Sequence, residues 1–286
     1  MPILRITSAV ERYRYFASPE FNIHALSGHG EDGLPNIQFV SARILSAIQP
    51  EARDVVLDVG CGDGYLLSQA AKTGAKCIGV VPTREEQEKL QAAVPGINFR
   101  VGLAQDLPLD SGCASKIVCN SVLLLLENED NVRSALTEIS RVAQIGARIW
   151  LGEVPAANEL AEFHVYNGTT TLGRLSHEWR IKGLRPFLAT LRSVVRSRFG
   201  KQTLLLDSCS IFHAPPDKFI RLASTCGLHI ESWHKHKRLD EEANESQLSD
   251  TTICSRKALE RKQCSLRSLW SCCAWLHGVL RKRFSR

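Results

Sequence analysis

A turn with three alternating glycines near residue 60 has the residue types that bind a small ligand. Residues 55–59 before it are β-branched and aliphatic apart from Asp58, and they predict a strand buried on both faces. Gly60, Gly62 and Gly64 follow, and then an apolar segment that can begin a helix. A glycine-rich turn between strand and helix lets the backbone approach a ligand closely and directs N–H groups towards it.

The spacing of these glycines separates two classes of cofactor. A dinucleotide-binding fingerprint has glycine at the sixth position of G-x-G-x-x-G, where this chain has Tyr65, so an NAD-dependent oxidoreductase is disfavoured. With Asp58 two residues before the first glycine, the run resembles motif I of the class I S-adenosylmethionine-dependent methyltransferases. The resemblance implies that Asp58 helps to hold the methionine amino group, directly or through water. The turn residues that it assigns to the cofactor are Gly60, Cys61, Gly62 and Gly64.

The end of the second predicted strand departs from the pattern of this family. The family usually carries an acid there that holds both ribose hydroxyls, and this chain has Val81. Thr83 or Gln87, on the following helical turn, is the predicted substitute, and Thr83 is preferred. The nearby acids Glu85 and Glu86 are interpreted as charges that complement the helix N-terminus.

The loop after the third predicted strand resembles the adenine-binding loop of the family. Leu103 replaces the acid that would accept a hydrogen bond from the adenine amine. The resemblance therefore leaves backbone recognition by Ala104 and Gln105, with Gln105 or Asp106 as the acceptor. It also places Asn120, at the end of the fourth predicted strand, beside the methionine moiety together with Ser121.

The segment Glu138-Ile139-Ser140-Arg141-Val142 resembles the Glu-x-x-Arg-Val helix of the methyltransferase type 11 group, and Arg141 is interpreted as structural. In such enzymes the protein positions the reactants and excludes water, and a base is needed only if the acceptor must lose a proton. The candidate bases are His213, after the apolar run 204–212, and Glu153, at the end of the fifth predicted strand. The alternatives are that His213 is a surface residue and that Glu153 is a structural acid.

Strands and helices alternate strictly between residues 51 and 155. This alternation predicts a Rossmann-like doubly wound α/β sheet, mostly parallel, with ligands bound at the carboxyl ends of its strands. Residues 228–236 and 251–255 resemble the antiparallel C-terminal hairpin that completes the seven-stranded methyltransferase sheet. The predicted strands are 54–59, 76–81, 97–101, 116–121 and 147–153, and the predicted helices are 64–73, 83–93 and 128–143.

The chain is divided into a helical lead-in at 1–50, a methyltransferase domain at 51–258 and a basic amphipathic tail at 259–286. Aromatic residues of the lead-in are predicted either to contact the substrate or to anchor the lead-in on the core. A helical insertion at 156–202 is a lid, an interfacial helix near anionic lipid or a helix packed on the core. The tail predicts a basic amphipathic helix on a membrane, in a partner groove or on the protein itself. The lead-in residues that are candidates for substrate contact are Tyr13, Tyr15, Phe16 and His24.

The composition is that of a soluble globular protein, with 286 residues, 44% of them hydrophobic, and a net charge of +6. None of the 10 cysteines has C-x-x-C spacing, so no zinc ribbon or other metal site is predicted. No signal peptide is recognised, and no apolar run reaches the roughly 18–20 residues of a membrane-spanning helix. The predicted location is the cytoplasm, with peripheral membrane association, and no specific nucleic-acid signal is present.

The predicted function is S-adenosylmethionine-dependent methyl transfer to oxygen or carbon of a small or lipid-linked acceptor. The alternative is a catalytically inactive methyltransferase-like protein that acts as a scaffold or a membrane-associated partner. Val81 and Leu103 favour this alternative, whereas Asp58 and the intact glycine turn oppose it.

Overall fold

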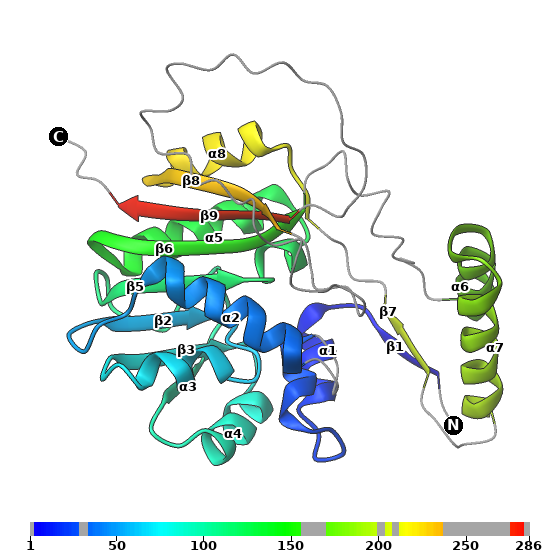
Figure 1. Ribbon diagram of the computed structural model, residues 1–286. Coiled ribbons are helices and arrows are strands. Elements are labelled where there is room, and N and C mark those ends of the chain that lie inside the picture. Colours follow the sequence, from blue (N-terminus) through cyan, green and yellow to red (C-terminus); the bar gives the residue numbers. More distant parts are fainter. Residues whose placement is uncertain are drawn as a thin grey trace, which may run out of the picture.

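The computed structural model describes residues 3–28, 34–155, 170–198, 204–207, 212–236 and 275–282. A twisted sheet forms the centre of the molecule, and helices cover both of its faces (Figure 1). Five neighbouring strands, counted from one edge of this sheet, are parallel, and the predicted α/β Rossmann-like class is confirmed. In spatial order they are β4 (Asn98–Val101), β3 (Lys76–Val81), β2 (Val55–Val59), β5 (Ala114–Asn120) and β6 (Ala143–Pro155).

The strand order reverses beside β2, which has β3 on one side and β5 on the other. In open parallel sheets, ligands bind in the crevice at the carboxyl ends of the strands next to such a reversal. The glycine turn follows β2 directly, so the topology places it at this crevice.

Two apolar clusters form the core, one on each face of the sheet. The helices contain apolar residues at a helical period, which lets each bury one stripe against the strands. One face is covered by α2 (Leu34–Ile48), α3 (Tyr65–Ala71) and α4 (Arg84–Ala93), and the other by α5 (Glu129–Val142) and α8 (Pro216–Thr225).

Arg141, on α5, is structural, as the sequence predicts. Its guanidinium pairs with Glu138 and donates to the Leu107 and Leu109 carbonyls at 3.0 and 2.8 Å. Glu138 in turn accepts a hydrogen bond from the Leu107 backbone N–H, and the hydrogen bond from Arg141 lowers the pKa of its carboxyl. These bonds anchor the loop that follows β4.

The far edge of the sheet corrects the prediction for the tail. β9 (Trp275–Lys282) lies between β6 and β8 (Leu228–His236) and runs antiparallel to both. The bounds of β8 agree with the prediction, whereas the predicted strand at 251–255 lies outside the described residues. The predicted tail helix is wrong for residues 275–282, because two neighbouring strands offer backbone partners that override the local 3.6-residue period.

The lead-in and the insertion meet at a second, two-stranded sheet. β1 (Ile3–Ile6) pairs in parallel with β7 (Leu204–Asp207), which follows the insertion. The lead-in continues with α1 (Ala9–Phe16) and η1 (Ile23–Ser27). The described part of the insertion consists of α6 (Thr171–His177), the π-helical η4 (Glu178–Lys182) and α7 (Leu184–Arg198). None of the helices in the described ranges is long and apolar enough to cross a membrane.

Candidate cofactor and acceptor site

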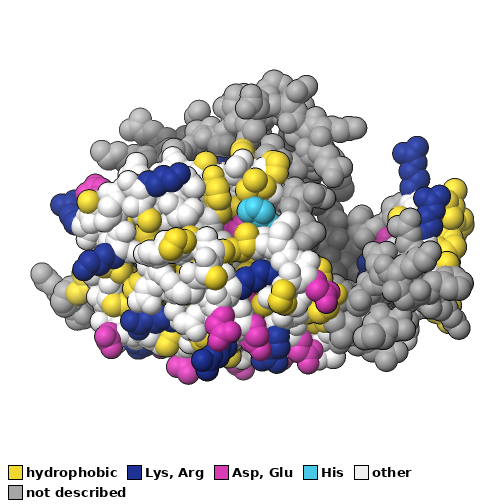
Figure 2. Space-filling model, turned by 90° about the horizontal axis from the view of Figure 1, so that it is seen from below, with side chains coloured by type: hydrophobic (Ala, Val, Ile, Leu, Met, Phe, Trp, Pro, Cys, Tyr) yellow, Lys and Arg dark blue, Asp and Glu magenta, His cyan; other side chains and the backbone are white. Residues whose placement is uncertain are grey.

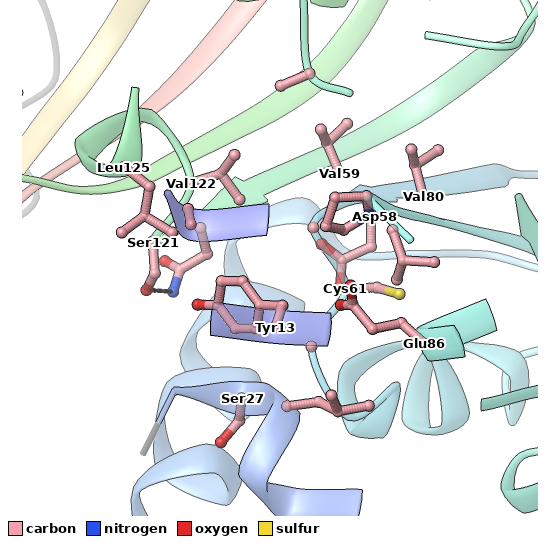
Figure 3. Close-up of a pocket in the computed structure, with 18 of the residues that line it drawn as sticks. Tyr13, Ser27, Asp58, Val59, Cys61, Val80, Glu86, Ser121, Val122 and Leu125 are labelled. Carbon is pink, nitrogen blue, oxygen red and sulfur yellow. Dashed lines mark hydrogen bonds between the residues drawn. The ribbon is translucent and has the colours of Figure 1, made fainter. Parts of the chain in front are cut away.

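A cavity of about 330 Å³ opens at the carboxyl ends of β2, β3 and β5 (Figure 3). Its other wall comes from α1, η1 and α2, so the lead-in completes the site. A volume of this size lies at the lower end of the range for small-molecule sites. The predicted cofactor residues that line the cavity are Asp58, Gly60, Cys61, Gly62, Val81, Ala104, Gln105 and Asn120.

The glycine turn forms the floor of this cavity. Gly60 and Gly62 have positive φ angles of 74° and 55°, a conformation that favours glycine. A Cβ atom at Gly60 would lie 2.3 Å from Cγ2 of Val122, so the turn also packs against the loop after β5. Gly64, at φ 74°, begins α3 and does not line the cavity, so its position favours a structural role.

Asp58 is a buried carboxyl that lines the cavity at the end of β2. Burial, and then the nearby charge of Asp63, raise its pKa to about 7. Asp63 itself lies 2.8 Å from Nδ1 of His24 and accepts a hydrogen bond from the Tyr65 backbone N–H at 3.1 Å. The Asp63–His24 contact fixes η1 over the glycine turn.

Thr83, the predicted substitute for the ribose-binding acid, caps a helix in the structure. It is the N-cap of α4, is buried, and does not line the cavity. Its hydroxyl accepts from the Glu86 backbone N–H at 3.3 Å and donates to Glu86 Oε1 at 2.7 Å, which is a form of the capping box. A threonine directly before a helix, with a glutamate three residues later, is the sequence pattern of a helix cap. The pattern T-x-x-E was therefore the signal for this structural role.

Glu86 is the site residue that sequence reasoning missed. Its side chain is only 2% exposed, yet it lines the cavity beside Val81, where the expected acid is absent. Burial raises the pKa of its carboxyl to about 7. Figure 3 shows Glu86 pointing from α4 towards the same region as Asp58 and Cys61. The interpretation as a simple helix-terminus charge is therefore incomplete.

The loop after β4 meets the cavity as predicted. Ala104 and Gln105 line it together with Leu103, which is 45% exposed and supplies an apolar surface. Asp106 does not line the cavity, and its backbone N–H donates to the Leu103 carbonyl at 3.0 Å. Gln105 is therefore the better placed of the two predicted acceptors.

A hydrogen-bonded chain joins the cavity to Glu153. Asn120 Nδ2 donates to Ser121 Oγ at 3.1 Å, and Ser121 Oγ donates to Glu153 Oε2 at 2.5 Å. Ser121 and Glu153 both have positive φ angles, 58° and 59°, which are uncommon for residues other than glycine. Such strained residues concentrate at functional sites. Ser121 lines the cavity, whereas Glu153 lies behind it and is buried.

The remaining candidates divide between the cavity and the surface. His213 is exposed and does not line the cavity, so its position does not support a role as base. Tyr13 lines the cavity, while Tyr15 and Phe16 form an edge-to-face cluster with Phe21. Substrate contact by Tyr13 thus stays a prediction, whereas Tyr15 and Phe16 have the packing role that the sequence offered as the alternative.

Comparison with known proteins agrees with this architecture. Residues 57–151, about a third of the chain, match the family model described as a methyltransferase domain. An uncharacterized methyltransferase of Mycobacterium tuberculosis is 31% identical over 102 residues, which are 36% of this chain and 40% of the relative. An uncharacterized 37.1 kDa protein in a transposon of Streptomyces fradiae is 28% identical over 116 residues, 38% of this chain and 33% of that protein. The chain thus spans about two fifths or less of the length of these relatives.

Solved structures share the fold. A chain of the complex between the Haloferax volcanii Trm112 methyltransferase activator and its methyltransferase gives a TM-score of 0.60 at 16% identity, over 95% of this chain and 98% of that one. An S-adenosylmethionine-dependent methyltransferase from Mesorhizobium loti gives 0.52 at 14% identity, over 86% and 98%. Residues 57–151 thus match a methyltransferase domain, and S-adenosylmethionine is the cofactor that this similarity implies.

The residues that line the cavity fit this cofactor. S-adenosylmethionine carries an ammonium and a sulfonium, and two buried acids, Asp58 and Glu86, face the cavity. Among the described residues, neither acid forms a salt bridge with a cation. A cationic ligand would favour their charged forms, which burial disfavours. The glycine turn adds a floor without side chains.

Proposed function

We propose that this protein transfers a methyl group from S-adenosylmethionine to an oxygen or carbon atom of a small or lipid-linked acceptor. The observation that carries the proposal is the shared cavity of the glycine turn, Asp58 and Glu86. Bound S-adenosylmethionine supplies a methyl group activated by its sulfonium. The protein acts at a cytoplasmic location, with peripheral membrane association, and the β8–β9 hairpin completes a seven-stranded methyltransferase domain.

Asp58 and Glu86 hold opposite parts of the cofactor in this proposal. Asp58, next to the glycine turn, accepts hydrogen bonds from the methionine ammonium. Glu86 accepts hydrogen bonds from the ribose hydroxyls and so replaces the acid that is missing at Val81. Its position beside Val81 in the cavity wall supports this role.

The acceptor occupies the part of the cavity between the lead-in and the loop after β5. This part is mainly apolar, with Val122, Leu125 and Leu126 on one side and Val10 on the other. Figure 3 shows the Tyr13 ring directed into this space. An acceptor with an apolar body and one polar reacting group fits such a lining, because apolar walls exclude water while a few polar groups orient the ligand.

Ser121 and Glu153 remove the acceptor proton. Ser121 Oγ has two lone pairs, one of which accepts from Asn120, so the other can accept from an acceptor O–H. As the acceptor oxygen forms its bond to the methyl carbon, the acceptor proton passes to Ser121 Oγ. The hydroxyl proton of Ser121 passes to Glu153 Oε2, along the existing hydrogen bond. Glu153 thus acts through Ser121.

Calorimetric titration with S-adenosylmethionine and S-adenosylhomocysteine tests cofactor binding. We expect saturable binding that Asp58→Asn weakens about 10- to 100-fold, because a hydrogen bond to a charged group contributes roughly 1.5–3 kcal/mol. Asp110→Asn, an exposed acid that does not line the cavity, is the matched control and should bind normally. Absence of binding by the folded wild-type protein would reject the proposal.

Turnover separates the enzyme from the inactive methyltransferase-like alternative. That alternative keeps support from Val81 and from the exposed Leu103, which remove two polar cofactor contacts of the family. An acceptor screen with lipid extracts and S-adenosylmethionine labelled in its methyl group should give a labelled product. Cofactor binding without transfer to any acceptor would favour the scaffold.

A further inference from the structure

The insertion presents apolar side chains to solvent. Leu172 on α6 is 81% exposed, Trp179 on η4 is 54% exposed, and Leu184 at the start of α7 is 55% exposed. On α7, four exposed apolar residues recur at positions i, i+4, i+7 and i+11, so they lie on one helical face. This face, called the α7 stripe below, consists of Leu184, Leu188, Leu191 and Val195.

Basic residues accompany the stripe. Exposed Arg185 and Arg192 each follow a stripe leucine by one residue, which places them about 100° around the helix, along one border of the stripe. The only acid between residues 171 and 198 is Glu178, and its side chain is buried. The exposed surface of this segment is therefore apolar and cationic. At the right of Figure 2, hydrophobic and basic side chains lie together on the part of the molecule that stands away from the sheet.

The stripe lies on a segment with internal order. The rings of Trp179 and Phe187 meet edge to face with centroids 5.3 Å apart, which joins η4 to α7. The Thr170 hydroxyl caps α6 by accepting from the Gly173 backbone N–H at 3.2 Å. The helices therefore present a defined surface to a partner.

We propose that the α7 stripe and its arginine border dock this protein on an anionic lipid bilayer. The interface of such a bilayer offers an apolar layer for the leucines beside negatively charged headgroups for the arginines. A second copy of the chain would bring Arg185 and Arg192 against identical charges, with no exposed acid on this segment to neutralise them. A nucleic acid would satisfy the arginines and leave the leucines in water.

The docking surface is connected to the acceptor side of the cavity. α7 leads to β7, which pairs with β1, and β1 leads into α1. Ser8, Ala9, Val10 and Tyr13, at the start of the chain after β1, line the cavity. The paired strands β1 and β7 thus connect the helix that carries the docking surface with the cavity wall next to the acceptor. This connection suits an acceptor that is delivered from a lipid surface. Membrane docking itself does not depend on methyl transfer.

Vesicle flotation of the full-length protein tests the proposal. We expect binding to phosphatidylcholine vesicles that contain phosphatidylserine and little binding to phosphatidylcholine alone. Leu188→Ser/Leu191→Ser and Arg185→Glu/Arg192→Glu should each lower the partition coefficient at least about tenfold, since each arginine near such a surface contributes about fivefold. Arg185→Lys/Arg192→Lys should retain most of the binding.

Matched controls distinguish the stripe from general surface properties. Ile145→Ser removes an exposed apolar residue elsewhere, and Lys72→Glu/Lys76→Glu reverses two exposed charges beside β3. Both should float like the wild type, and all variants should keep the wild-type melting temperature and cofactor affinity. Equal loss in the controls would show a general charge effect and would overturn the proposal.

Three other outcomes would also overturn it. They are absence of lipid-dependent flotation in the wild type, a concentration-dependent dimer abolished by Leu188→Ser/Leu191→Ser in light scattering, and RNA binding that depends on Arg185 and Arg192 without vesicle binding. Because cofactor binding is measured in parallel, failure of docking and failure of the proposed enzyme activity are separate results.

Discussion

The cofactor cavity and the α7 stripe distribute polar and apolar groups in opposite ways. In the cavity, the carboxyls of Asp58 and Glu86 are buried and their pKa values are raised to about 7. On α7, leucines are exposed and arginines border them. Each arrangement is unfavourable in water alone, since buried charges need a partner and large apolar patches need cover. The contrast supports the two ligands proposed above, a cationic cofactor in the cavity and an anionic lipid surface at the α7 stripe.

The largest expected effect concerns Glu153. Glu153→Gln keeps an acceptor for the Ser121 hydroxyl but cannot take a proton, so kcat should fall about 10²-fold or more while the cofactor Kd stays unchanged. Glu153→Asp, which keeps a carboxylate, should restore part of the rate. Equal falls in kcat and in cofactor affinity would instead indicate a structural acid.

Substitutions in the two regions should change the free energy of unfolding by different amounts. Gly60→Ala should lower the free energy of unfolding by about 1–3 kcal/mol, because its Cβ would clash with Val122 at a positive φ. Leu188→Ser on the exposed α7 stripe should change it by less than about 0.5 kcal/mol. Urea denaturation measures both values. A large loss with Leu188→Ser would mean that the stripe packs against the protein in solution.

Cofactor affinity should depend on pH. In the proposed complex, carboxylates hold the ammonium and the ribose hydroxyls, and burial raises the pKa of both carboxyls to about 7, so they are protonated in the free protein below that pH. Affinity should therefore rise as pH increases through 7, by about tenfold per unit and per carboxylate below that value. Calorimetry across this range is the measurement. A flat profile would show that neither acid contacts the cofactor.

The last expected effect is a change in the stability of the free protein with pH. The folded-state pKa of Glu86 is raised from its ordinary 4.5 to about 7, so the stability linked to its protonated form is fully present below pH 4.5. It is lost as pH rises through 7, and the shift corresponds to an upper limit of about 3 kcal/mol. Glu86→Gln should melt with less dependence on pH and, at pH 8, above the wild type. Glu85→Gln, at the exposed neighbour, should melt like the wild type.

Local sequence patterns predicted the parts of this protein whose structure depends on near neighbours. The bounds of β3 and β8 agree with the predicted strands 76–81 and 228–236, and a turn glycine precedes each of them, at Gly74 and Gly227. The glycine turn and Asp58 lie in the cavity because a strand, a turn and a helix in succession leave few other arrangements. The structural role of Arg141 could be predicted because it lies on a helix that must be joined to the edge of the sheet.

Tertiary structure decided the rest. Residues 275–282 belong to a segment with a helical pattern, and only the strands β6 and β8 beside them select β9. The local pattern T-x-x-E indicates the Thr83 cap, but only the packing of α4 against the sheet directs the carboxyl of Glu86 to the cavity. The same holds for Glu153 on β6, which reaches the site through Ser121, the residue just after β5. Sequence patterns report local periods, whereas a binding site combines residues from distant segments.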